Sequence, residues 1–181
     1  MLLILLYGGG LRVGEALHLT LRDVDVIEKI ITVRHTKFFK TRLVPIGPKL
    51  ARELAAYMQR RRELPLPLGD DSRLFTTKTG RGWPYPHVNT LFHHVRRAAG
   101  VVCAAESRPP RIHDIRHTAA VHRVVAWYRS GRDVQRLLPR LATYLGHVDI
   151  KSTQRYLHMT TDLLQEASRR FASYAQSENS L

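Results

Sequence analysis

The chain has 181 residues, of which 29 are Lys or Arg and 15 are Asp or Glu, so its formal net charge is +14. Its length predicts one domain, and its 44% hydrophobic share is that of a folded protein rather than a disordered one. No apolar run approaches the roughly 20 residues of a membrane span. The single cysteine, Cys103, excludes an internal disulfide and a Cys-based zinc site, and it favours an intracellular protein.

A charge of +14 predicts a polyanionic partner. Nucleic acid is favoured, because neutralising its phosphates releases counterions and drives binding. An anionic membrane surface is less favoured, since no basic amphipathic anchor is evident. A merely basic protein without such a partner would carry the same charge, so the charge alone does not separate these readings.

The first half of the chain predicts helix, then sheet, then helix. The apolar start, residues 1–7, continues through three glycines into residues 11–21, and we expect one bent, tightly packed helix there. Residues 24–46 hold β-branched runs around a basic stretch, which predicts a small antiparallel sheet with a basic hairpin. Pro45 restricts the last strand to an edge or an end. Gly47 and Pro48 then start a helix that we expect to reach about residue 63.

The second half predicts helices joined by loops. Residues 65–86 read as a loop with a short extended piece at 74–76. The expected helices cover residues 87–99, 112–129, 133–145, 151–158 and 162–175, with Gly131 and Gly146 marking two of the breaks. The predicted fold class is therefore mostly α with a small antiparallel β-sheet, in a single domain over residues 1–181.

Several segments carry residues with useful chemistry, although each also has a plain structural interpretation. His113 and Arg116 are three apart on a predicted helix, so they share a face that suits an anionic group. Arg12 has a local partner three residues on in Glu15, Lys37 fits a solvated turn, and Tyr156 fits a half-buried core position. No carboxylate cluster suited to two magnesium ions is visible. The histidine pairs 93–94 and 113–117 lack a third ligand, so we predict no metal site.

The order of these segments is more specific than any one of them. They read GLRVGE at 10–15, TKFFKTRLVPI at 36–46, HDIRHT at 113–118 and LGH at 145–147, with Tyr156 nine residues after His147. This series resembles the tyrosine recombinases, or phage integrases, and it runs from near residue 5 to near residue 175. The stretch 121–147 also looks like integrases carried by transposons. The resemblance implies the catalytic-domain fold of these DNA breaking and rejoining enzymes.

The resemblance also implies a role for each matching residue. Tyr156 would attack the scissile phosphodiester and form a 3′-phosphotyrosine, without metal, ATP or other cofactor. Arg12 and Arg116 would clamp the non-bridging oxygens, and His147 would add a hydrogen bond to them. His113 would act as general base or orient the nucleophile, and Lys37 would protonate the leaving 5′-oxygen. Glu15 would steady the Arg12 helix. A phenol needs such help, because its reference pKa is about 10.

The surrounding basic residues suit contacts to the backbone of double-stranded DNA. They are Arg34, Lys40, Arg42, Lys78, Arg81, Arg111, Arg132, Lys151 and Arg155. The last predicted helix has an apolar stripe, with a tail behind it to residue 181. The stripe packs on its own domain, or it docks on a neighbouring protomer and links subunits of a tetramer on DNA; the sequence does not favour either.

The chain departs from the family's usual pattern in two places. We expect that the N-terminal core-binding domain is absent and that the chain is truncated ahead of the first catalytic-domain helix, which would weaken DNA binding. Gly9 stands where the family often has threonine. The favoured function is a site-specific recombinase or integrase in the cytoplasm, associated with the nucleoid. One alternative is a catalytically impaired DNA-binding remnant of such an integrase. Another is a topoisomerase-like enzyme that nicks and rejoins without strand exchange.

Overall fold

The computed structural model describes residues 1–34, 41–101, 108–147, 153, 165 and 168. These residues belong to two compact units, Met1–Arg116 and His117–Leu181, and the division falls inside one helix. The predicted helices at 151–158 and 162–175 fall almost wholly outside the described residues. No helix in the described ranges is both long enough and apolar enough to cross a bilayer.

The first unit begins with two short helices, α1 (Leu2–Gly9) and α2 (Val13–His18), where we expected one bent helix. That prediction was wrong, because Gly10 adopts a left-handed conformation (φ 60°) and ends α1. Leu11 is buried between the helices, and Arg12 is the extended residue that precedes α2. The break therefore places Arg12 at the N-terminus of a new helix.

A three-stranded antiparallel sheet follows a short 3₁₀ turn, η1 (Leu21–Asp23), as the β-branched runs predict. Its strands are β1 (Val24–Asp25), β2 (Ile30–Val33) and β3 (Arg42–Pro45), in the order β1-β2-β3. Ile31 pairs with Val44, and both are fully buried. Pro45 ends an edge strand, where its missing N–H costs no ladder hydrogen bond.

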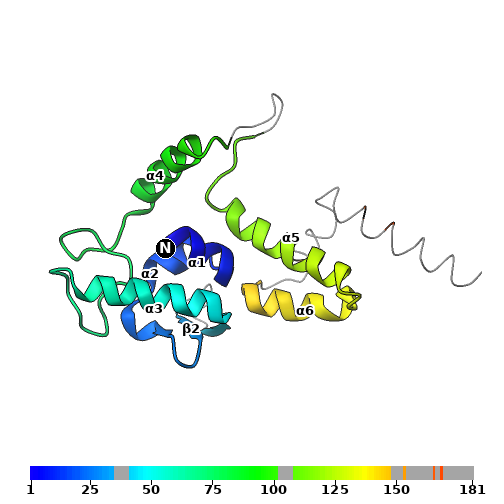
Figure 1. The fold of residues 1–181 in the computed structure, drawn as a ribbon, viewed down its shortest axis with the longest axis horizontal. Helices are drawn as coiled ribbons and strands as arrows, with labels where there is room; N and C mark the ends of the chain where they lie inside the picture. Colours follow the sequence, from blue (N-terminus) through cyan, green and yellow to red (C-terminus); the bar gives the residue numbers. More distant parts are fainter. Residues whose placement is uncertain (35–40, 102–107, 148–152, 154–164, 166–167, 169–181) are drawn as a thin grey trace, which may run out of the picture. The chain divides into compact units, whose positions relative to one another are not determined.

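Two longer helices complete the first unit, α3 (Pro48–Arg62) and α4 (Tyr85–Ala98). Pro48 suits the first helical position, because its fixed φ fits the helix and its missing N–H would have no partner there. α3 packs against α1, and α4 contacts α2 (Figure 1). Gly100, with φ 66°, follows the end of α4. Both helices lie within two residues of the predicted bounds.

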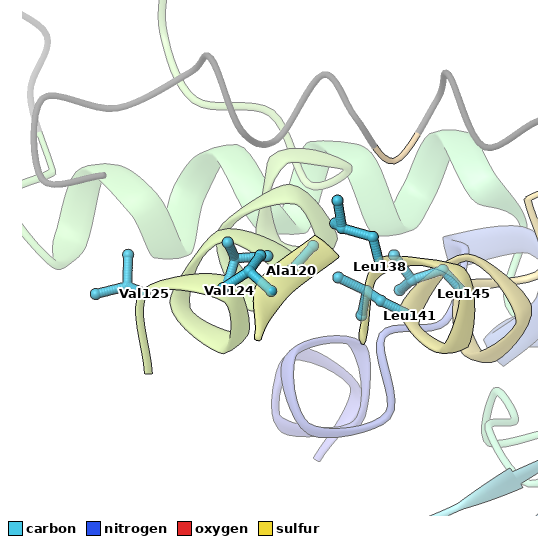
Figure 2. Close-up of a cluster of buried hydrophobic side chains, with 7 residues drawn as sticks. Ala120, Val124, Val125, Leu138, Leu141 and Leu145 are labelled. Atoms are coloured by element: carbon cyan, nitrogen blue, oxygen red, sulfur yellow. The ribbon is translucent and has the colours of Figure 1, made fainter. Parts of the chain in front are cut away.

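The second unit rests on α5 (Asp114–Arg129) and α6 (Val134–Leu145). Figure 2 shows the apolar side chains of the two helices packed together: Ala120, Val124 and Val125 from α5, with Leu138, Leu141 and Leu145 from α6. Asp133 caps α6 by accepting a hydrogen bond from the Arg136 amide (3.1 Å). Gly131 and Gly146 both have positive φ and lie at the predicted breaks.

Candidate functional site

An arginine cluster in the first unit centres on the carboxylate of Glu15. The Arg12 side chain donates to Glu15 Oε1 (2.8 Å), and the Arg12 backbone amide donates to Oε2 (2.8 Å). Arg42, at the start of β3, donates from both terminal nitrogens, to Oε1 (2.9 Å) and Oε2 (2.7 Å). Arg116 Nη1 lies 3.9 Å from Oε2. One carboxylate thus orients guanidinium groups from three separate segments of the chain.

Arg116 is the most deeply placed member of this cluster, because its side chain is only 3% exposed. Its Nη1 donates a hydrogen bond to the carbonyl of Gly10 (2.6 Å), the residue that breaks α1 from α2. A buried guanidinium needs such acceptors, since an unsatisfied buried charge is strongly unfavourable. The Arg12 side chain, by contrast, is 37% exposed, so the cluster is open to solvent at Arg12 and closed at Arg116.

The ionisation of Glu15 reflects its neighbours. Burial alone would raise the pKa of this carboxyl. The Arg42 hydrogen bonds, the Arg12 backbone amide, the charge of Arg42 and the Arg12 side chain act the other way and lower the pKa to about 2. Glu15 is therefore a fixed anion at neutral pH, and the three arginines keep their common counter-ion.

Arg42, which the sequence predicts as a DNA contact, pairs with Glu15 in the structure. The Arg42 side chain is 13% exposed, and both terminal nitrogens of its guanidinium donate to the Glu15 carboxylate. Strand alternation was the signal for this placement, because Arg42 is two residues from the buried Val44 and shares its face of β3. Sequence reasoning missed the pairing, since Glu15 is 27 residues away along the chain.

His113 lies just before α5, half-buried, at the edge of a hollow of about 470 Å³. The side chains around this hollow include Tyr85, Asn89 and His93 from α4, with Arg108, Arg111 and His113 from the segment that leads into α5. A hydrogen bond from Arg96 to the Pro110 carbonyl (2.8 Å) ties α4 to that segment. Sequence reasoning missed the α4 residues, although 85, 89 and 93 recur at the spacing of one helix face.

His147 lies in the second unit, immediately after the left-handed Gly146 that ends α6. A hydrogen bond of 2.7 Å joins His147 Nδ1 and Thr153 Oγ1. Thr153 is fully buried, so its hydroxyl fixes the orientation of the imidazole. Sequence reasoning did not single out Thr153.

The other predicted DNA contacts that the structure describes lie in varied settings. Arg34 pairs with Asp23 (2.6 Å), and Arg111 pairs with Asp114 (3.2 Å). Lys78 and Arg81 are exposed on a turn that Gly80 makes with φ 78°, and Arg132 is exposed before α6. The predicted site residues Lys37, Lys40, Lys151, Arg155 and Tyr156 lie outside the described residues. Within the described ranges, no group of three or more His, Cys, Asp or Glu side chains could hold a metal.

This geometry is that of a helical domain with a small sheet, in which Arg12, Arg42 and Arg116 surround one carboxylate. Residues 1–162 match the phage integrase family, and the chain belongs to this family. The integrase/recombinase y4rB of Sinorhizobium fredii is 41% identical over 92% of this chain and 53% of its own length. The chain thus spans about half the length of the curated relatives it matches.

Solved structures confirm the predicted fold class. The crystal structure of XerA recombinase aligns with a TM-score of 0.73 and 26% identity, over 92% of this chain and 55% of XerA. The Tn1549 transposon integrase, solved in complex with a circular intermediate DNA, aligns with a TM-score of 0.68 and 21% identity. The alignment covers 93% of this chain and 57% of the Tn1549 integrase chain. The small sheet and surrounding helices are therefore those of a tyrosine recombinase catalytic domain.

Proposed function

We propose that this chain is the catalytic part of a site-specific DNA recombinase that cleaves and rejoins DNA through a 3′-phosphotyrosine. The observation that carries the proposal is the cluster around Glu15. It brings Arg12, from the start of α2, and Arg116, from the start of α5, to the same carboxylate counter-ion, by a hydrogen bond from Arg12 and at 3.9 Å from Arg116. These are the two arginines that the family resemblance assigns to the scissile phosphate. Family membership and the basic charge of +14 support DNA as the substrate.

In the proposed reaction, the Tyr156 hydroxyl attacks the scissile phosphorus and loses its proton to His113. The bond from phosphorus to the 5′-oxygen breaks, and Lys37 protonates the departing oxygen to give a free 5′-hydroxyl. Arg12, Arg116 and His147 stabilise the charge on the non-bridging oxygens. Attack by the 5′-hydroxyl of a partner strand reverses the step and joins the strands, so the bond energy is conserved and no ATP is needed.

Covalent trapping tests this proposal. The full chain is mixed with nicked duplexes made from DNA that flanks its own gene. After cleavage, the short fragment that carries the new 5′-hydroxyl diffuses away and leaves the covalent complex. A denaturing gel then separates protein–DNA adducts from free protein. We expect an adduct with the wild type, none with Tyr156→Phe, and an undiminished adduct with the control Tyr128→Phe, a half-buried tyrosine that packs on the α5–α6 cluster.

The arginine assignment has its own test. Arg12→Ala removes a half-exposed guanidinium, so the chain should fold and still bind DNA. Loss of a preorganised donor typically slows such chemistry by about 10²–10³-fold, and we expect a loss of that size in the rate of adduct formation. Equal losses in binding and cleavage would reduce Arg12 to an ordinary phosphate contact. An adduct with Tyr156→Phe, or none with a wild-type chain that binds the same DNA, would contradict the proposed function.

We propose further that protomers assemble on double-stranded DNA in the cytoplasm, with the C-terminal apolar stripe docking on a second copy. The stripe consists of Leu163, Leu164, Ala167, Phe171 and Tyr174. Mass measurement of the chain with and without duplex DNA tests this assembly. A DNA-dependent increase to a dimer or tetramer, lost in Leu164→Asp, is the expected result; assembly that survives this substitution would contradict docking through the stripe.

A further inference from the structure

A row of arginines follows the exposed side of α6, and the reaction proposed above does not use it. The row consists of Arg132, Arg136 and Arg140, which we call the α6 arginine row, and its members are spaced four residues apart. They line a shallow hollow of about 300 Å³ together with Asp133 and Leu137. All three arginines are exposed.

The row lies on the side of α6 that faces away from the core. Val134, Leu138, Leu141 and Leu145 form the buried stripe of this helix. Positions 136 and 140 fall on the opposite side at 3.6 residues per turn, which agrees with their exposure. The row therefore has no part in packing α6 onto α5, and its charges are displayed to solvent.

Few acidic residues lie near this row in the sequence to neutralise it. Between His117 and His147 the sequence holds five arginines and one acid, Asp133. The Asp133 carboxylate accepts from the Arg136 amide as the cap of α6. Neither Arg136 nor Arg140 forms an ion pair with any residue in the described ranges. Like charges four residues apart on a helix repel each other. This repulsion raises the free energy of the row, and a bound polyanion would offset it.

The dimensions of the row suit one strand of a nucleic acid. Arg136 and Arg140 are separated by about 6 Å along the helix axis, at 1.5 Å per residue. A duplex strand advances about 3.4 Å per nucleotide along the axis and winds around it, so guanidiniums about 6 Å apart on flexible stems can each reach a different phosphate of one strand. Exposed arginines with flexible stems bind phosphates in this way without reading the sequence.

We infer that the α6 arginine row is a DNA-backbone contact separate from the scissile-phosphate residues. The inference rests on the proposed function only in taking DNA as the ligand. Its role is to add affinity that is independent of sequence and sensitive to salt. An acidic protein segment would be the other chemical match, but the family and the charge of the whole chain favour DNA.

The salt dependence of binding tests the inference. Affinity of the full chain for a short fluorescein-labelled duplex is measured by anisotropy over a series of KCl concentrations. For Arg136→Gln/Arg140→Gln we expect the slope of log K against log [KCl] to become shallower by about 1.8, because each lost phosphate contact accounts for about 0.9. Arg136→Lys/Arg140→Lys keeps both charges and should retain the wild-type slope.

The matched control is Arg52→Gln/Arg60→Gln on α3. Both of these arginines are exposed, and a glutamate lies close to each in sequence, Glu53 or Glu63. The control should leave the slope unchanged. Circular dichroism and thermal unfolding confirm that each variant is folded, which we expect because the substituted side chains are exposed.

Three results would overturn the inference. The first is an unchanged slope in Arg136→Gln/Arg140→Gln, which is also what an acidic protein partner of the row would give. The second is an equal change in the α3 control, and the third is a lysine variant that behaves like the glutamine variant. If the wild type forms the Tyr156 adduct while the slope stays unchanged, the inference alone fails. If the wild type binds no duplex, the inference and the proposed function fail together.

Discussion

Glu15 is one carboxylate shared by Arg12, Arg42 and Arg116, and its low pKa has a consequence for stability. A carboxyl whose pKa is lower in the folded than in the unfolded chain stabilises the fold whenever it is ionised. Here the pKa falls from the ordinary 4.5 to about 2. The stabilisation is therefore complete above about pH 4.5 and is lost as the pH falls toward 2.

We predict that the ionisation of Glu15 contributes on the order of 3 kcal/mol to the free energy of unfolding at neutral pH. Glu15→Gln should destabilise the chain by about 3–5 kcal/mol, because it leaves buried guanidiniums without their anion. Urea unfolding between pH 7 and pH 3 checks this, with Glu53→Gln on the exposed side of α3 as the control. The difference between wild type and Glu15→Gln should shrink as the pH falls; a difference that is independent of pH would contradict the assignment.

The sequence indicates the Arg12–Glu15 pair of this cluster but not the link from Glu15 to Arg42. Arg12 with Glu15 is predicted from a spacing of three, and the structure confirms that pair. The Arg42 fork depends on the antiparallel pairing of β3 with β2, which sets where residue 42 falls relative to α2. Such a contact between distant segments has no local signature. In the structure, the alternation of buried and exposed residues along β3 places Arg42 on the same face as Val44.

At the scale of elements, the turn between α1 and α2 determines where Arg12 lies, at the N-terminus of α2. Gly10 is buried and left-handed, and its carbonyl accepts the Arg116 hydrogen bond. The sequence suggested a continuous bent helix, because three successive glycines do not reveal which of them leaves the helical region. The neighbouring Gly14, within α2, has no atom within 4 Å of the position a Cβ would occupy.

We predict opposite results for alanine at these two glycines. Gly10→Ala should cost about 1–2 kcal/mol, since a side chain disfavours the left-handed conformation. Gly14→Ala should stabilise the chain by about 0.4–1 kcal/mol, because it reduces the freedom of the unfolded state in a position that accepts a Cβ. Thermal unfolding of both variants checks the pair. Equal effects of the two substitutions would show that the turn does not depend on Gly10.

The α5–α6 contact is the other element-level feature, and it joins two helices that the sequence predicts at 112–129 and 133–145. Leu138 is 2% exposed in this cluster (Figure 2). We predict that Leu138→Ala costs about 2–5 kcal/mol through lost burial and a residual cavity. Chemical denaturation measures the loss. Ala126→Ser, at an exposed position of α5, is the matched control and should change stability by less than about 0.5 kcal/mol.

At the scale of the whole molecule, the excess of positive charge governs behaviour in solution. Acidic side chains are few, and several are already engaged: Asp23 with Arg34, Asp71 with Arg22, and Asp114 with Arg111. The 29 Lys and Arg therefore far exceed the 15 Asp and Glu available to neutralise them. Composition predicts this excess directly, but not which arginines are consumed by internal pairs.

We predict that duplex DNA raises the midpoint of thermal unfolding at low salt. A ligand that binds only the folded chain stabilises it by about 2.7 kcal/mol at 100 times its dissociation constant. The shift should disappear in high KCl, because phosphate contacts weaken steeply with salt. Differential scanning fluorimetry with the same duplex at low and high KCl makes the comparison. A shift that survives high salt would indicate binding that is not dominated by phosphate charge.

The Glu15 cluster also has a charge balance that suits a reaction at phosphorus. Three guanidiniums and one carboxylate leave two positive charges. A phosphodiester in its ground state bears one negative charge, and the five-coordinate transition state of the proposed attack bears a second. The cluster is thus closer to electroneutral with the transition state than with the substrate. An enzyme accelerates a reaction by this kind of preference, because only interactions that strengthen on the way to the transition state lower the barrier.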